Sequence, residues 1–212
     1  MEIAIALYDG ITVLDAVGPY EPLSRLPGAE IRFVGAEAGP KESDSKALTL
    51  VADYTVEQVP SPEVIVVPGG PGSRAESGDA LLEWIRSAHE TSRWTTSVCT
   101  GSLLLGKAGV LEGLRATSHW AHLERLRDYG AEPTTERVVE QGKVVTAAGV
   151  SSGIDMALRL IQLEAGDQVA EAIQLSIEYD PQPPLDAGSP AKARPEIIEL
   201  VRAAERGELN LT

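Results

Sequence analysis

The stretch Arg93–Gly109, with the sequence RWTTSVCTGSLLLGKAG, constrains the fold of this chain most strongly. Its first part is rich in β-branched and aromatic residues, which predicts a short buried strand. Its second part, from Gly101 to Lys107, is rich in leucine and predicts a helix. Cys99, the only cysteine of the chain, falls where the strand becomes the helix. A side chain on such a tight turn projects from the edge of the sheet, as in a nucleophile elbow.

This position favours a reactive thiol over a structural one. The start of the following helix presents unpaired backbone N–H groups and a partial positive charge next to Cys99. We therefore expect this environment to favour the thiolate, which is the nucleophilic form of cysteine. The alternative is that a lone cysteine packs as a small hydrophobic residue. The order strand–Cys–x–Gly–helix favours the nucleophile.

Apolar strands alternate with helices along most of the chain. Buried strands are predicted at Ile3–Leu7, Ile31–Val34 and Glu63–Val67, with helices following the first and the third. Hairpins are predicted within Gly39–Val51 and around Gln141–Gly142. This alternation predicts an α/β fold with a doubly wound, mostly parallel sheet that carries helices on both faces.

The last third of the chain is predicted to be helical, with one extended segment. A helix begins at Ser151 with a Ser or Thr cap, a second runs from Gly166 to Tyr179, and a third covers Arg194–Arg206. The proline-rich segment PQPPLDAGSP between the last two predicts a strap across the surface rather than a linker. We therefore expect one domain over residues 1–212, in which residues 180–212 form the strap and the C-terminal helix.

Composition excludes several classes of function. The chain has 18 Lys and Arg against 32 Asp and Glu, a net charge of −14, which argues against binding to nucleic acid or to anionic membranes. It has no recognisable signal peptide and no apolar run of the roughly 18 residues that a membrane span needs. A lone cysteine excludes an intrachain disulfide and suits a reducing cytoplasm. The three histidines lack metal-ligand spacing, so no metal site is predicted.

Three groups of residues follow the carboxyl ends of predicted parallel strands, where ligands bind in sheets of this kind. They are Asp15, Gly69–Gly70 and Cys99. Asp15 is a candidate proton carrier if burial raises its pKa, although it could instead cap its own helix. The backbone N–H groups of Gly70 and Thr100 are candidate donors to developing negative charge.

Thr100 and His119 offer further side chains to this site. The Thr100 hydroxyl lies one residue from the sulfur, where it either caps the helix or orients substrate or water. His119 opens a predicted helix beside Trp120, and both packing and a secondary catalytic role are open for it. His89 and His122 are predicted on solvent-facing helix positions.

Four segments together carry a resemblance to a known family: SVCTGSLLLGKAGVLEGLRATSHW, VIVVPGGPG, LDAVGPYEPL and AGVSSGIDMAL. They resemble the PfpI-type proteins of the class I glutamine amidotransferase-like superfamily, and within it the isocyanide hydratases. The resemblance runs from Ile3 to about Pro190. It implies a flavodoxin-like fold, a homodimer, no cofactor and a small-molecule substrate.

The resemblance also implies roles for individual residues. Cys99 matches the nucleophile, Asp15 matches the acid that hydrogen-bonds the sulfur or the reacting water, and Gly70 and Thr100 match donors of the oxyanion type. The implied reaction is attack of Cys99 on an isocyanide carbon to give a thioimidate. Hydrolysis of the thioimidate then releases an N-substituted formamide.

Two positions depart from related proteins. Thr100 stands where PfpI-type proteases have a histidine, which argues against proteolysis, and Ala147–Ala148 stands where the hydratases have a glycine run. The alternatives are a glyoxalase- or deglycase-like enzyme for reactive carbonyls, or a ligand-binding or redox-sensing regulatory domain. The first would require a Cys–His set that includes His119. A regulator would require a helix-turn-helix module, for which the six residues after Arg206 leave no room.

Overall fold

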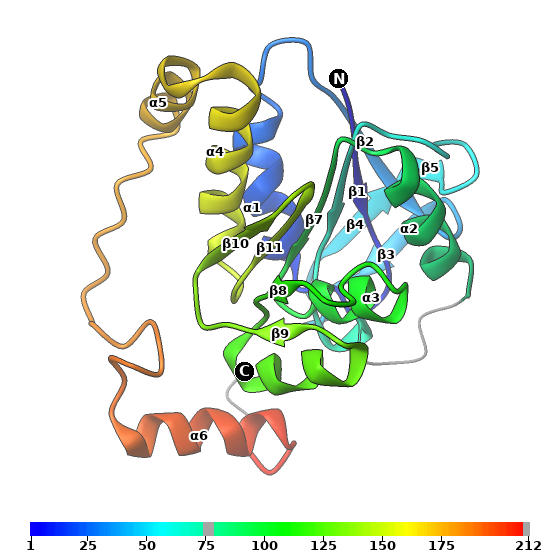
Figure 1. Ribbon diagram of the computed structural model, residues 1–212. Helices are drawn as coiled ribbons and strands as arrows, with labels where there is room; N and C mark the ends of the chain where they lie inside the picture. Colours follow the sequence, from blue (N-terminus) through cyan, green and yellow to red (C-terminus); the bar gives the residue numbers. More distant parts are fainter. Residues whose placement is uncertain (74–78, 210–212) are drawn as a thin grey trace. The chain divides into compact units, whose positions relative to one another are not determined.

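A seven-stranded sheet forms the centre of the structure, a computed structural model that describes residues 1–73 and 79–209 (Figure 1). All its neighbouring strands are parallel except the antiparallel pair at one edge, β10 and β11. The predicted mostly parallel sheet is thereby confirmed. In spatial order the strands are β10 (Val138–Gln141), β11 (Val144–Ala147), β7 (Trp94–Val98), β6 (Val64–Val67), β1 (Glu2–Ala6), β2 (Glu30–Gly35) and β5 (Tyr54–Thr55).

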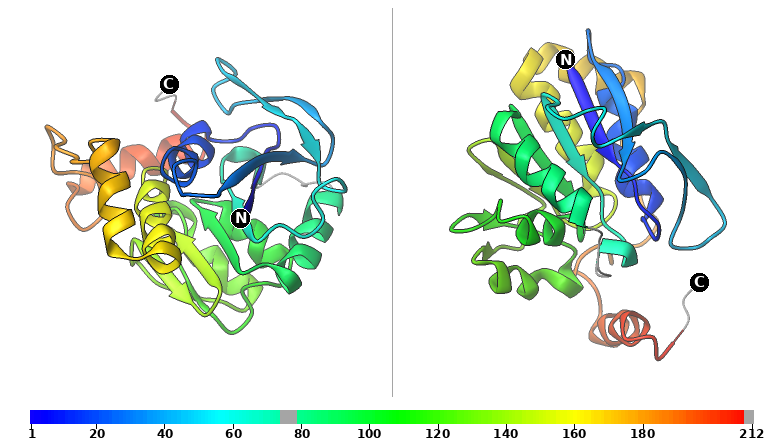
Figure 2. Two further views of the ribbon diagram at one scale, coloured as in Figure 1. Left: turned by 90° about the horizontal axis from the view of Figure 1, so that it is seen from above. Right: turned by 90° about the vertical axis from the view of Figure 1, so that its right-hand side faces the viewer.

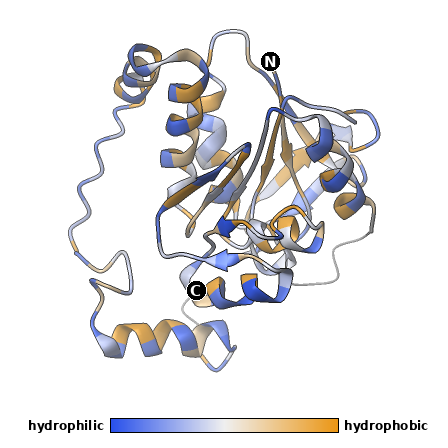
Figure 3. Ribbon diagram, viewed as in Figure 1, coloured by the Kyte–Doolittle hydropathy of each residue, from blue (hydrophilic) through white to orange (hydrophobic). Residues whose placement is uncertain are grey.

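The central strands form because their residues are apolar on both faces of the sheet (Figure 3). In β1 the buried side chains of Ile3 and Ile5 belong to one hydrophobic core, and those of Ala4 and Ala6 belong to the other. Ile5 pairs with Phe33 on one side and with Val66 on the other. Strand β1 therefore lies inside the sheet, with a parallel neighbour on each side.

Helices cover both faces of the sheet, as predicted (Figures 1 and 2). Residues of α1, α4 and α5 complete one core, and residues of α2 and α3 complete the other. The α-helices of this part of the chain are α1 (Val13–Leu23), α2 (Asp79–Thr91), α3 (Gly101–Lys107), α4 (Ser152–Ala165) and α5 (Asp167–Ser176). There are also two 3₁₀ helices in the described residues: η1 (Pro71–Ser73) precedes α2, and η2 (Trp120–Tyr129) lies between α3 and α4 in the sequence.

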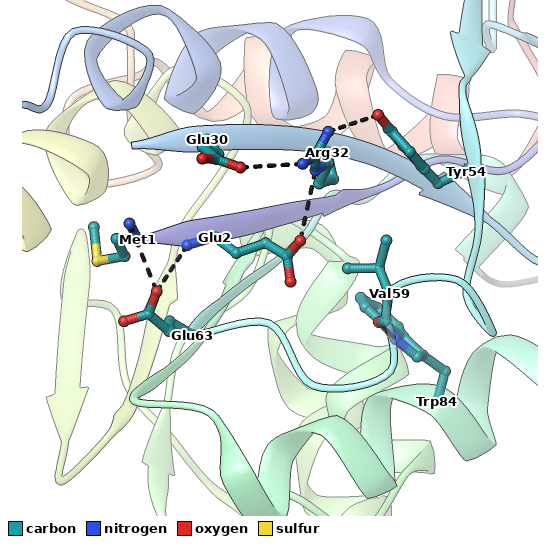
Figure 4. Close-up of polar contacts among 8 residues, drawn as sticks. All are labelled: Met1, Glu2, Glu30, Arg32, Tyr54, Val59, Glu63 and Trp84. Carbon is teal, nitrogen blue, oxygen red and sulfur yellow. Dashed lines mark hydrogen bonds and ion pairs between the residues drawn. The ribbon is translucent and has the colours of Figure 1, made fainter. Parts of the chain in front are cut away.

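Short strand pairs lie outside the central sheet. The predicted hairpin within residues 39–51 is formed by β3 (Gly39–Glu42) and β4 (Thr49–Ala52), and β8 (Arg115–Ala116) pairs with β9 (Glu132–Pro133). The second predicted hairpin is β10–β11. At the amino ends of β1 and β2, Arg32 contacts Glu2, Glu30 and Tyr54 (Figure 4).

Several helix details differ from the predictions. Ser151 precedes α4 but its side chain makes no capping hydrogen bond, and α5 ends at Ser176 because Ile177 leaves the helical region, three residues before Tyr179. His89 is half-buried rather than solvent-facing, since its Nδ1 lies 2.9 Å from the Thr95 hydroxyl. Burial lowers the pKa of this histidine.

The contacts within the chain divide it into two compact units, Met1–Ile177 and Glu178–Thr212. In the second unit, residues 178–194 contain no helix or strand, and α6 (Pro195–Glu205) has no buried residue. The strap across the surface and the single domain stay predictions. No helix in the described part of the chain is long and apolar enough to cross a membrane.

Candidate active site

The structure brings the three predicted groups together at one edge of the sheet. Asp15 lies in the first turn of α1, Gly69 follows β6, and Cys99 follows β7. Because β1, β6, β7 and β11 are neighbours and parallel, the segments at their carboxyl ends converge. The fourth of these segments, after β11, contributes Val150, whose backbone N–H lowers the pKa of Cys99.

Cys99 occupies a strained turn. Its φ of 58° lies in the left-handed region, which costs a non-glycine residue on the order of 1–2 kcal/mol. Hydrogen bonds hold this conformation: the Cys99 N–H donates to the Ala148 carbonyl at 2.8 Å. The Cys99 carbonyl accepts from the hydroxyls of Ser102 and Ser118, both at 3.1 Å. The side chain is thereby fixed between β7 and α3.

Two glycines allow the neighbouring segment to approach this turn. A Cβ on Gly69 would lie 2.5 Å from the backbone nitrogen of Thr100, and a Cβ on Gly101 would lie 2.0 Å from the Val67 carbonyl oxygen. Both distances are too short for any side chain, because the obstructing atoms are backbone. Glycine at these positions is therefore required for the ends of β6 and β7 to pack as they do.

The carboxyl group of Asp15 is fully buried. Its Oδ2 accepts the Gly69 N–H at 2.9 Å, whereas Oδ1 has no hydrogen-bond partner among the described residues. Thr12, not Asp15, is the N-cap residue of α1, so the alternative that Asp15 caps its own helix is wrong. A buried carboxyl oxygen without a partner is costly to maintain, and such groups gather at functional sites.

Burial raises the pKa of Asp15 to about 7. The Gly69 N–H and the Cys99 thiol act in the opposite direction because both stabilise the carboxylate, and the charge of Asp44 raises the pKa slightly further. With this pKa, Asp15 can release or accept a proton near neutral pH, and its role as a proton carrier stays a prediction.

The thiol of Cys99 differs from the expectation. Burial and the neighbouring Asp15 carboxylate raise the pKa of Cys99, and the N–H groups of Thr100 and Val150 lower it only in part. The expected effect of the helix start is present, but desolvation outweighs it in a side chain that is only 5% exposed. The thiol and the carboxylate therefore form a pair in which the sulfur retains its proton at rest.

The hydroxyl of Thr100 forms hydrogen bonds with other residues of the site. It accepts the Gly70 N–H at 2.9 Å and lies 2.8 Å from the hydroxyl of Ser73. It does not cap α3. Two expectations differ from this. The Gly70 N–H was expected to donate to developing negative charge, but it already donates to Thr100. The Thr100 hydroxyl was expected to cap the helix or to orient substrate or water, but it holds the loop that contains Gly70 and Ser73. The donors beside the sulfur are the backbone N–H groups of Thr100 and Val150.

His119 lies beside this site, next to the segment that follows β11. A Cβ on Gly149 would lie 3.0 Å from its Cδ2, so the ring packs closely against the segment that carries Val150. The ring also neighbours Trp120 and His122, with centroids at 5.8 and 6.0 Å. The main influences on the pKa of Cys99 are burial, Asp15, Thr100 and Val150. His119 therefore stays a secondary candidate.

Sequence reasoning missed three residues that support the site: Val150, Ser73 and Ser118. Val150 could have been found by the rule that identified Asp15 and Cys99, since it follows the end of a parallel strand. Ser73 and Ser118 could not, because their hydroxyls act through contacts 27 and 19 residues away in sequence. No local pattern indicates such contacts.

Comparisons with known proteins concern the family and the fold of the chain. The profile of the DJ-1/PfpI family matches residues 1–163. An isonitrile hydratase from Pseudomonas putida is 40% identical over 212 residues, which cover 100% of this chain and 92% of that protein. The crystal structure of a ThiJ/PfpI family protein from Pseudomonas syringae superposes with a TM-score of 0.92 at 37% identity, covering 96% of this chain and 86% of the other. An HTH-type transcriptional regulator from Pseudomonas aeruginosa, CdhR, is 28% identical over 82% of this chain but only 53% of its own length.

Proposed function

The chain belongs to the DJ-1/PfpI family, and from this premise we propose that it is an isocyanide hydratase, which adds water to an organic isocyanide to give a formamide. The observation that carries the proposal is the buried pair of Cys99 and Asp15, in which a carboxyl that titrates near pH 7 contacts a lone thiol. The similarity to an isonitrile hydratase along the whole chain supports the substrate class, since isonitrile and isocyanide are two names for one group.

The first step is attack of the thiol on the isocyanide carbon. The Asp15 carboxylate accepts the proton of Cys99 as the sulfur bonds to carbon, and the resulting acid passes that proton to the same carbon. One S–H bond breaks while one S–C and one C–H bond form, which gives a thioimidate. The N–H groups of Thr100 and Val150 stabilise negative charge on the sulfur before the new bond is complete.

The second step is hydrolysis of the thioimidate. Water adds to the carbon, the nitrogen gains a proton, and the carbon–sulfur bond breaks to release the formamide and the Cys99 thiol. The Oδ1 atom of Asp15 offers a buried acceptor for the proton of the attacking water. One carboxyl thereby serves both steps, because its pKa of about 7 lets it accept and donate a proton at neutral pH.

The direct test is to mix the purified protein with a simple aryl isocyanide and follow loss of the isocyanide and appearance of the formamide. Methylglyoxal is assayed in parallel. Formamide production without turnover of methylglyoxal supports the hydratase. Turnover of methylglyoxal alone would replace it by the glyoxalase alternative, and saturable binding of isocyanide without turnover would support a ligand-binding domain.

Other properties rest on the sequence or on the family resemblance. The homodimer, the cytoplasmic location and the lack of a cofactor or metal stay predictions of the sequence. They do not enter the chemistry above, since every step uses groups of one chain. The proposed substrate is small and largely apolar, and no nucleic acid or membrane is proposed as a partner.

Replacing His119 by alanine is expected to reduce formamide production less than about tenfold, because Asp15 already supplies the proton partner of Cys99. The residual effect reflects lost packing against Gly149. The measurement is kcat and KM for the isocyanide, with thermal unfolding as the check on folding. A loss as deep as that caused by removing the thiol would assign the chemistry to a Cys–His pair.

A further inference from the structure

Tyr8 lies next to the site but has no role in the chemistry described above. It lies two residues after the end of β1, is partly buried, and packs against both hydrophobic cores of the sheet. Its hydroxyl donates a hydrogen bond to the carbonyl oxygen of Pro68 at 2.6 Å, which is at the short end of the range for such bonds. The phenol therefore joins the end of β1 to the loop that follows β6.

The Pro68 carbonyl shares one peptide group with the N–H of Gly69. That N–H donates to Oδ2 of Asp15 at 2.9 Å. Because a peptide group is planar, a hydrogen bond that fixes its carbonyl also fixes the direction of its N–H. A donor on the carbonyl oxygen also polarises the group and strengthens the N–H as a donor. The three groups form a chain from the Tyr8 hydroxyl through the peptide to Asp15.

Other contacts of Tyr8 restrain the same loop. A Cβ on Gly72 would lie 3.0 Å from the Tyr8 ring, so the ring packs closely against the backbone of the loop that follows β6. In the same loop, the Ser73 hydroxyl donates to the Gly70 carbonyl at 2.7 Å and lies 2.8 Å from the hydroxyl of Thr100. Burial, followed by the charge of Asp15, raises the pKa of Tyr8, so its hydroxyl stays a donor at neutral pH.

We propose that Tyr8 is a positioning residue, whose hydroxyl holds the Pro68–Gly69 peptide in the orientation in which the Gly69 N–H donates to Asp15. The inference rests on the proposed roles of Asp15 and Cys99 but not on the identity of the substrate. The groups that act on the Asp15 carboxyl are the Gly69 N–H, the Cys99 thiol and the charge of Asp44. Loss of the Tyr8 hydroxyl weakens the hydrogen bond from the Gly69 N–H to Asp15 and leaves the effects of Cys99 and Asp44 in place.

The test uses the pH dependence of Cys99 alkylation by iodoacetamide, which needs no isocyanide. Alkylation is specific because Cys99 is the only cysteine. In the wild type, the alkylation rate should rise with pH through an inflection near 7, where Asp15 becomes able to accept the Cys99 proton. In Tyr8→Phe, which keeps the ring and its packing, this inflection should move up by about 0.5 unit. Below the inflection this is an approximately threefold slower reaction. Tyr54→Phe is the matched control, because the Tyr54 hydroxyl accepts from Arg32 on β2 (Figure 4). The groups that shift the pKa of Asp15 do not include Tyr54.

An Asp15→Asn background separates the proposed route from a general loosening of the site. There, Tyr8→Phe should leave the alkylation profile unchanged, because the group that receives the effect is gone. An unmoved inflection in Tyr8→Phe, or an equal change with and without Asp15, would overturn the proposal. A shifted inflection in a protein that makes no formamide would leave the role of Tyr8 intact and reject the hydratase alone.

Discussion

Replacing Cys99 by serine or alanine is expected to abolish formamide production, with a loss of at least about 1,000-fold in kcat. A serine hydroxyl is far less acidic than a thiol, so Asp15 cannot draw its proton off as the oxygen attacks the isocyanide carbon. Alanine removes the nucleophile altogether. The measurement is formamide released per mole of enzyme, with far-UV circular dichroism and thermal unfolding as checks on the fold.

Alkylated wild-type protein provides the matched control for this loss. Because Cys99 is the only cysteine, iodoacetamide should inactivate the enzyme in proportion to the sulfur that it modifies. Both variants should fold, since the backbone of residue 99 keeps its hydrogen bonds to Ala148, Ser102 and Ser118. Formamide production by a folded Cys99→Ser protein at more than about a hundredth of the wild-type rate would show that the thiol is not the nucleophile.

Replacing Asp15 by asparagine is expected to lower kcat about 100-fold or more at pH 7.5, because the amide neither accepts the Cys99 proton nor returns it to carbon. The amide keeps the shape of the side chain, and its oxygen can still accept the Gly69 N–H. Asp128→Asn, on the exposed side of η2, makes the same chemical change away from the site. Near-normal turnover in Asp15→Asn would remove the proposed proton transfer.

The same substitution is expected to stabilise the fold at neutral and higher pH. The pKa of Asp15 is about 7 in the folded protein against an ordinary value of 3.8. Between these values the folded state holds a proton that the unfolded chain has released, so the contribution of Asp15 to stability falls as pH rises through this window. Compared with wild type, Asp15→Asn should gain little near pH 4 and on the order of 4 kcal/mol above pH 7.

Urea unfolding of both proteins between pH 4 and 8 measures this difference. Subtracting one free energy of unfolding from the other removes the titration of the remaining carboxyl groups, which the two proteins share. A difference that is constant with pH would show that Asp15 titrates normally in the folded protein. Lower activity together with higher stability is the expected signature of a buried functional carboxyl.

The arrangement of the site follows from the sequence to the extent that it depends on the sheet. Runs such as Val64–Val67 and Trp94–Val98 identify buried parallel strands, and residues at the ends of such strands must meet. Asp15, Gly69 and Cys99 could therefore be placed together before the structure. Gly69 and Gly101 are required by a close approach of two backbones, which also follows from that meeting.

The electrostatic state of the site could not be predicted in the same way. The helix start beneath Cys99 indicates a lowered thiol pKa, but the depth of burial decides the balance and depends on packing from both sides of the turn. The use of the Gly70 N–H by Thr100 depends on a side-chain rotamer. The proposed role of Tyr8 depends on the Pro68–Gly69 peptide group, which joins the side chains of Tyr8 and Asp15, seven residues apart in the sequence.

The pH dependence of kcat/KM for formamide production tests the shared proton of Cys99 and Asp15 most directly. We predict a rate that rises with pH through one inflection near 7, because only the carboxylate form of Asp15 can accept the thiol proton. The inflection should disappear in Asp15→Asn. A flat profile between pH 5 and 9 in the wild type, or an inflection that survives in Asp15→Asn, would contradict a mechanism in which these two residues act as one unit.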